Sequence, residues 1–122
     1  MPMKQVMNFL FKTSLILLCI LSTSYYCYFY ITPSVTVINN SQYRLTEVNV
    51  KLRNSNLNFG SIEPEQINSI HYSLKQMDGS YDYSFKIGDS RVRGTCGYIT
   101  SSEFNKRFEI IVSTSDVVTC VQ

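Results

Sequence analysis

The chain has 122 residues and a formal net charge of +2, from 11 Lys and Arg against 9 Asp and Glu. Lys4 and Lys12 account for this excess, because every acidic residue and the other basic residues lie beyond residue 32. The remainder is formally neutral, and a neutral domain has no net field that attracts nucleic acid. About 90 residues form this remainder, which is enough for one small domain and excludes a second.

An uncharged stretch, TSLILLCILSTSYYCYFYIT, occupies residues 13–32, and no charged side chain occurs between Lys12 and Arg44. A helix that rises ~1.5 Å per residue needs ~20 mostly apolar residues to cross a ~30 Å hydrocarbon core. The stretch therefore predicts a membrane-spanning helix, which ends before Pro33 because proline does not extend a helix comfortably. The expected organisation is a short cytoplasmic N-terminus at 1–12, a transmembrane segment at 13–32 and an extracytoplasmic domain at 33–122.

The stretch has two interpretations, which differ in whether the leader is cleaved. In the first it is an uncleaved signal anchor, whose aromatic second half forms an interfacial belt. In the second, residues 1–24 are a secretory signal peptide, and the small residues at 22–24 form the cleavage site. The protein would then be secreted after cleavage near Ser24. The apolar character resumes after Ser24, which favours the anchor. The belt would consist of Tyr25, Tyr26, Tyr28 and Tyr30.

The charges beside the stretch predict its orientation. Lys4 and Lys12 precede it with no acidic residue nearby, so the N-terminus should stay in the cytoplasm. The C-terminal domain should then be periplasmic or extracellular, on a single-pass protein of the cell membrane. The membrane is the first partner that the sequence predicts.

The four cysteines fall into two pairs. Cys19 and Cys27 belong to the uncharged stretch, whereas Cys96 and Cys120 belong to the domain. An exported compartment is usually oxidising, so a Cys96–Cys120 disulfide is expected. Cleavage after Ser24 would leave Cys27 as an odd third thiol, and this parity also favours the anchor.

Beyond Pro33 the pattern becomes that of short strands. Apolar residues alternate with polar ones, and turn residues recur every ~8–12 positions, as in an all-β protein. Asp78-Gly79 is a strong hairpin signal, residues 102–105 allow one helical turn, and a turn is expected at 113–116. Without intervening helices, an antiparallel sandwich of seven or eight strands is the expected fold class. The expected strands lie around 35–37, 48–52, 57–62, 70–74, 81–87, 92–98, 108–112 and 117–121.

One part of this pattern resembles a known kind of module. The run SVTVINNSQYRLTEVNVKLRN, followed by FGSIEPEQINSI, resembles the opening of many bacterial immunoglobulin-like modules. Those modules carry a V-x-V-x-N strand, a second alternating strand and a G-x-I/L-x-P-G turn. The match covers Val35 to about Ile70, with Glu65 where the glycine of the turn is usual. The resemblance implies an immunoglobulin-like sandwich and names no functional residues.

Residue types that could carry catalysis are sparse. His71 is the only histidine, it is expected on the outward face of its strand, and no G-x-S-x-G motif surrounds a serine. Asp78 and Asp82 are the nearest to a carboxylate pair and are explained equally well as turn and surface residues. We therefore expect no enzyme activity, no cofactor, no metal and no small-molecule substrate.

A protein partner is the remaining expectation. Lys86, Arg91 and Arg93 lie on outward faces near one hairpin and form a possible partner-docking patch. The leading hypothesis is a non-catalytic binding or structural module; the alternative is a membrane-tethered immunity or inhibitor protein that acts on a toxin or an envelope hydrolase. Asn39-Asn40-Ser41 matches the glycosylation sequon. Arg44, Lys51 and Arg53 could extend the patch.

Overall fold

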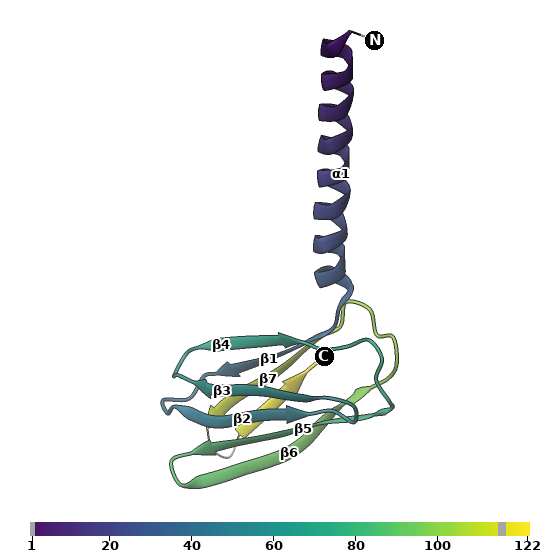
Figure 1. Cartoon of the computed structure of the whole chain (residues 1–122). Helices are drawn as coiled ribbons and strands as arrows, with labels where there is room; N and C mark the ends of the chain where they lie inside the picture. The colour runs from purple at the N-terminus through teal and green to yellow at the C-terminus, as the bar shows by residue number, and fades with distance from the viewer. Residues whose placement is uncertain (1, 115–116) are drawn as a thin grey trace. The chain divides into compact units, whose positions relative to one another are not determined.

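The structure is a computed structural model that describes residues 2–114 and 117–122. The chain divides into two compact units, the segment that ends at Ile31 and the domain Thr32–Gln122 (Figure 1). The first unit is the helix α1, Met3–Ile31, which is long and apolar enough to cross a membrane and has no buried residue. It starts well before residue 13, because Lys4 and Lys12 are good helix formers that end the apolar stretch without ending the helix.

The second unit consists of two four-stranded sheets (Figure 1). The spatial order of the strands is β4-β1-β7-β8 in one sheet and β3-β2-β5-β6 in the other. The strands are β1 (Ser34–Asn39), β2 (Leu45–Lys51), β3 (Asn56–Ile62), β4 (Ile67–His71), β5 (Gly79–Ile87), β6 (Ser90–Ile99), β7 (Arg107–Thr114) and β8 (Val117–Val121). The expectation of a mostly β domain with short strands is confirmed. The turn expected at 113–116 lies partly outside the described residues.

One pairing departs from the expected antiparallel arrangement. β1 pairs with β7 in parallel, in a register that runs from Ser34 opposite Arg107 to Asn39 opposite Val112. All other strand pairs are antiparallel among the described residues. The chain makes this parallel pair without a crossover helix, because five strands, distributed over both sheets, separate β1 from β7. The expectation of a fully antiparallel arrangement is therefore wrong at the β1–β7 pair.

The region after β4 also differs from expectation. β4 ends at His71, so the expected strand through Leu74 is too long. Tyr72 is nevertheless buried, so the alternation of Ile70 and Tyr72 continues past the end of the strand. β4 and β5 lie in different sheets, so residues 72–78 cross between the sheets and Asp78-Gly79 does not form the expected hairpin. Residues 102–105 form turns rather than a helical turn.

The two sheets share one hydrophobic core. Its centre is an aromatic stack of Tyr81 on β5 and Phe108 on β7, whose ring centroids lie 3.9 Å apart with planes 7° from parallel. Both side chains are almost fully buried. The stack joins a strand of each sheet, so it fixes the faces that meet. The other fully buried apolar side chains include Val35, Val37, Leu45, Val48, Val50, Ile62, Phe85, Ile99, Ile110 and Val112.

A glycine allows the stack to approach β6 closely. Gly97 has a φ of 71° and lies where the β5–β6 register shifts, between the pairs Tyr81–Cys96 and Gly79–Ile99. A Cβ at this position would lie 2.6 Å from Cε2 of Phe108 and 2.9 Å from Cδ2 of Tyr81. Gly97 therefore meets two needs at once, a left-handed backbone and the absence of a side chain.

Asn39 closes the end of β1 through a buried polar network. Its Nδ2 donates to the carbonyls of Tyr43 (2.8 Å) and Ile62 (3.1 Å). Its Oδ1 accepts from the backbone N–H of Ser41 (3.0 Å) and from the Ser41 hydroxyl (2.5 Å). Asn39 is fully buried. The sequon nitrogen is therefore committed to the fold and inaccessible to glycosylation.

We expect Asn39→Ala to destabilise the domain by about 2 kcal/mol, because it removes the buried hydrogen bonds that the side chain makes to the Ile62 carbonyl and accepts from the Ser41 N–H. Asn40→Ala is the matched control, since Asn40 is the adjacent amide and is exposed. Urea unfolding of the full-length chain in mild detergent measures both. Equal losses in the two variants would contradict a structural role for Asn39.

The turn from β3 to β4 explains the residue that replaced glycine in the resemblance. The N–H of Gln66 donates to the carbonyl of Glu63 at 3.1 Å, with Pro64 and Glu65 between them. Glu65 has a φ of 63°, the left-handed value that the third residue of a type II turn requires. Its N–H donates to the Asn39 carbonyl at 2.7 Å. The turn is thus kept with a non-glycine residue.

Candidate binding site

The outer face of the β3-β2-β5-β6 sheet carries polar side chains in two cross-strand rows. Strand alternation turns these side chains away from the core, and the register aligns them across all four strands. The first row is Asn58, Asn49, Ser84 and Arg93. The second row is Asn56, Lys51, Asp82 and Thr95.

An open hollow of about 620 Å³ lies over these rows. Close packing beneath it depends on Gly94, where a Cβ would lie 2.2 Å from the Tyr83 hydroxyl oxygen. The Tyr83 side chain is partly buried and packs against the core. The hollow is therefore a polar depression on a solid sheet. Its lining residues are Asn49, Lys51, Asn56, Asp82, Tyr83, Ser84, Arg93, Gly94 and Thr95.

The lining contains polar groups whose bonding capacity is unused. Oδ1 of Asn49 is buried and has no hydrogen-bond partner among the described residues. Lys51 and Arg93 form no ion pair with any residue that the structure describes. Asp82 differs, since it accepts from Oγ1 of Thr95 at 2.9 Å. The hollow thus offers two unpaired cations, Lys51 and Arg93, to a ligand.

The predicted docking patch is divided by an acidic side chain. Lys86 lies opposite Arg91, and Oε2 of Glu47 lies 3.6 Å from the Lys86 Nζ and 2.5 Å from Nη2 of Arg91. Arg91 also donates to the Ser84 hydroxyl at 2.9 Å. Arg93 is two residues further along β6 and lines the hollow instead. Two of the three patch cations are therefore neutralised.

The three cations that could have extended the patch have different positions. Lys51 lines the hollow with Arg93. Arg44 pairs with Glu63 at 2.9 Å, and Arg53 donates to the Asp78 carbonyl at 3.0 Å. Only Lys51 therefore joins the polar face. Sequence reasoning missed Asn49, because its significance depends on the register with Ser84 and Asn58.

The candidate catalytic histidine lies apart from the two candidate carboxylates. His71 is exposed at the end of β4, in the sheet that does not carry the hollow. Asp78 and Asp82 line a smaller hollow of about 460 Å³ beside the first. No group of three or more His, Cys, Asp or Glu that could hold a metal occurs among residues 2–114 and 117–122.

The two cysteines paired by the sequence analysis connect the two sheets. Cys96 on β6 and Cys120 on β8 form a disulfide with a Cα–Cα distance of 6.4 Å. Each strand is the last in its sheet. The disulfide therefore closes the edge where β6 and β8 face each other and holds the C-terminal strand in place.

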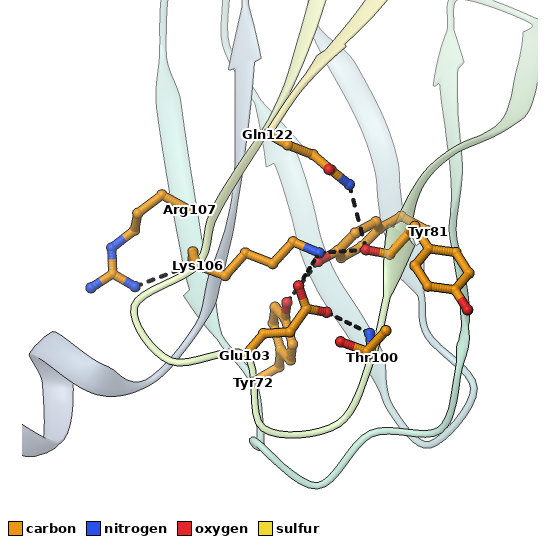
Figure 2. A network of polar contacts seen from close by, with 8 residues as sticks. Tyr72, Tyr81, Thr100, Glu103, Lys106, Arg107 and Gln122 are labelled. Carbon is orange, nitrogen blue, oxygen red and sulfur yellow. Dashed lines mark hydrogen bonds and ion pairs between the residues drawn. The ribbon is translucent and has the colours of Figure 1, made fainter.

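A second polar cluster lies at the end of the domain where β1 and β7 begin (Figure 2). Nζ of Lys106 lies 2.7 Å from Oε2 of Glu103 and 5.3 Å from the centroid of the Tyr81 ring, and it donates to the Tyr98 carbonyl. The Tyr72 and Tyr81 hydroxyls lie 2.6 Å apart. Oε1 of Glu103 accepts from the backbone N–H of Thr100 at 2.5 Å. These contacts fix residues 100–106 as an ordered loop.

The cluster shifts three pKa values. Burial raises the pKa of Tyr81 far above 10, and the hydrogen bond to Tyr72 raises it further. Burial also raises the pKa of Tyr72, against the opposing effect of the same hydrogen bond. For Glu103 burial acts to raise the pKa, but the bonds from Lys106 and the Thr100 N–H outweigh it and lower the value. The cluster thus favours the neutral form of both tyrosines and the ionised form of Glu103.

The raised pKa values of Tyr72 and Tyr81 predict that the domain loses stability at alkaline pH. Stability should be complete below the unfolded tyrosine pKa of ~10 and should fall as pH rises towards the folded values, because only the unfolded state ionises readily. Absorbance of tyrosinate during an alkaline titration should show two late-ionising residues. Tyr72→Phe should remove one of them, whereas Tyr43→Phe, at an exposed position outside the cluster, should leave both. A late-ionising component of unchanged size in Tyr72→Phe would contradict the prediction.

Comparisons with known proteins identify the fold alone. The chain matches no protein-family model, and it matches no curated protein sequence. It is similar to an NMR structure of a protein from Eubacterium rectale, with a TM-score of 0.53 and 10% sequence identity. The match covers 74% of this chain and 86% of the other.

Proposed function

We propose that the protein is a single-pass membrane protein that presents a non-catalytic binding domain outside the cytoplasm. The main support for a membrane anchor is the apolar helix α1, which has 29 residues and no buried residue. An exposed apolar surface of this length has no stable place in water. Its uncharged part, residues 13–31, rises roughly 28 Å, close to the ~30 Å of a hydrocarbon core.

Hydroxyl groups within α1 are compatible with lipid. Oγ1 of Thr13 donates to the Phe9 carbonyl and Oγ1 of Thr23 to the Cys19 carbonyl, each at 2.8 Å. Each donor is therefore satisfied inside the helix, as a bilayer requires. Lys4 and Lys12 favour a cytoplasmic N-terminus. A Cys96–Cys120 disulfide is the state expected in an oxidising compartment, which agrees with export of the domain.

We assign the domain to the immunoglobulin-like sandwich class on its strand arrangement. Two sheets of four strands enclose one core, and the chain changes sheet between β1 and β2, β3 and β4, β4 and β5, and β6 and β7. Such connections are typical of sandwiches. The parallel β1–β7 pair makes the proposed arrangement a variant.

The binding face that we propose is the polar hollow of the β3-β2-β5-β6 sheet. Asn49 lines the hollow, so its amide group lies at the face that a partner would cover. Lys51 and Arg93 favour a carboxylate on that partner. A partner protein with an acidic polar segment fits this arrangement, and electrostatic complementarity would set its orientation.

In-cell photo-crosslinking of the full-length chain tests this face. A photoreactive residue at Asn56, which lines the hollow, should give a discrete crosslinked product. The same residue at Thr119, exposed on β8 of the other sheet, is the positional control. Only the Asn56 position should crosslink if the hollow is the binding face.

A matched pair of arginine variants separates the hollow from general charge effects. Arg93→Ala should abolish or strongly reduce the product formed from Asn56, because it removes an unpaired cation of the hollow. Arg44→Ala should leave the product unchanged, since Arg44 already pairs with Glu63. Equal products from Asn56 and Thr119, or an undiminished product with Arg93→Ala, would refute this assignment.

A further inference from the structure

The end of the domain next to α1 is built from three adjoining segments. Arg107 donates from Nη1 to the Thr32 carbonyl at 2.6 Å, and the N–H of Ser34 donates to the Lys106 carbonyl at 2.9 Å. The N–H of Tyr72 donates to the Pro33 carbonyl at 3.0 Å. The 72–78 connection therefore begins, and the 100–106 loop ends, beside the chain that leaves α1.

This end carries large exposed apolar side chains. Phe104 is 65% exposed on the 100–106 loop, and Met77 is 54% exposed on the 72–78 connection. A bond from the N–H of Ser102 to the Leu74 carbonyl, at 2.9 Å, joins the two segments. Lys75, on the same connection, is exposed as well.

The loop that carries Phe104 is held in shape from inside. Glu103 and Lys106, on either side of it, pair with each other, and Lys106 also lies over the Tyr81 ring (Figure 2). Ser102 and Asn105 have φ values of 60° and 55°, which reverse the chain around Phe104. Phe104 is thus the large apolar side chain of the loop that the fold leaves exposed.

The length of the connecting chain limits how far this end lies from a bilayer. Only Thr32 and Pro33 separate the end of α1 from β1. Three steps of extended chain span at most ~10 Å, whatever the orientation of the two parts. The polar interface of a bilayer extends ~5–8 Å beyond the hydrocarbon core. The end of the domain is therefore within reach of lipid.

We propose that Phe104 and Met77 insert into the interface of the membrane that α1 spans, with Lys75 at the headgroups. The inference rests on the proposed anchoring by α1. Aromatic residues are favoured at this depth, and apolar side chains gain by leaving water there. Docking by two loops would fix the orientation of the domain and keep the polar hollow clear of lipid.

The chain contains no tryptophan, so a single introduced tryptophan is a specific probe. Phe104→Trp and Met77→Trp report on the proposed docking end. Tyr43→Trp is the matched control, because Tyr43 is 63% exposed in the turn after β1, roughly 20 Å from its start. The full-length variants are reconstituted in phosphatidylcholine vesicles, with and without lipid brominated near the top of its acyl chains.

Docking predicts a shift of the Phe104→Trp emission to shorter wavelength and a loss of intensity with brominated lipid, with the same changes for Met77→Trp. The Tyr43→Trp emission should show neither. If the protein floats with the vesicles while both docking-end probes emit as in water, docking is wrong and the anchor stands. If the protein does not float with the vesicles, the anchor itself is wrong and the docking inference falls with it.

Discussion

Gly97→Ala should lower the free energy of unfolding of the domain by roughly 3–4 kcal/mol, because overpacking costs ~1–3 kcal/mol and a left-handed alanine costs ~1–2 kcal/mol. The new Cβ would lie 2.6 Å from Phe108 and 2.9 Å from Tyr81, and these two rings form the stack that joins the sheets. Neither ring can move without opening the core. Urea unfolding of the full-length chain in mild detergent measures the loss.

Gly88→Ala separates the two causes. Gly88 also has a positive φ, 59°, but no heavy atom lies within 4 Å of the position that its Cβ would occupy. It should therefore show only the backbone cost of about 1–2 kcal/mol. If both variants lose the same stability, the contact of Gly97 with the aromatic stack is energetically unimportant and this account of β6 is wrong.

Cys96→Ser combined with Cys120→Ser should destabilise the domain by about 3 kcal/mol, the value expected for a cross-link between residues 24 positions apart. The loss arises mainly because the unfolded chain gains conformational freedom. A reducing agent should lower the stability of the unmodified protein to that of the double variant and should leave the double variant unchanged. Unfolding by urea, with and without reductant, measures both effects.

The two remaining cysteines provide the control. Cys19→Ser with Cys27→Ser changes the same number of thiols within α1, where both are unpaired, and should leave the response to reductant intact. Stability that does not respond to reductant in the unmodified protein would contradict a structural role for the Cys96–Cys120 disulfide.

Local patterns predicted the elements better than they predicted their connections. The alternation over 81–87 corresponds to β5, Gly79–Ile87, because Tyr81 and Phe85 face the core. The same reasoning extended β4 beyond His71, since Tyr72 is buried in a connection and not in a strand. Alternation reports burial, and burial persists where a connection crosses the core.

Long-range pairing lay beyond the sequence pattern. Nothing near residues 34–39 indicates that β1 takes β7 as a parallel partner, because that choice depends on how both sheets close. The patch of Lys86, Arg91 and Arg93 followed from alternation, but its neutralisation by Glu47 did not. Glu47 reaches these cations from a bulge with a φ of 50°, a conformation that its residue type does not signal.

The candidate site shows the same division. Sequence reasoning placed Lys51 and Arg93 on outward faces, and both line the hollow. It could not identify the buried Oδ1 of Asn49, because the register neighbours of that residue, Ser84 and Asn58, come from two other strands. The hollow depends on the register of four strands, and the β2–β5 register within it joins strands that are far apart in the sequence.

A reporter enzyme that requires disulfides for activity, fused after Gln122, tests the central claim most directly. The account predicts an active reporter in intact cells, together with protease digestion of the domain from outside the membrane. A reporter that is inactive and protected within the cytosol would contradict an exported domain, and with it the proposed partner face and the membrane docking of Phe104.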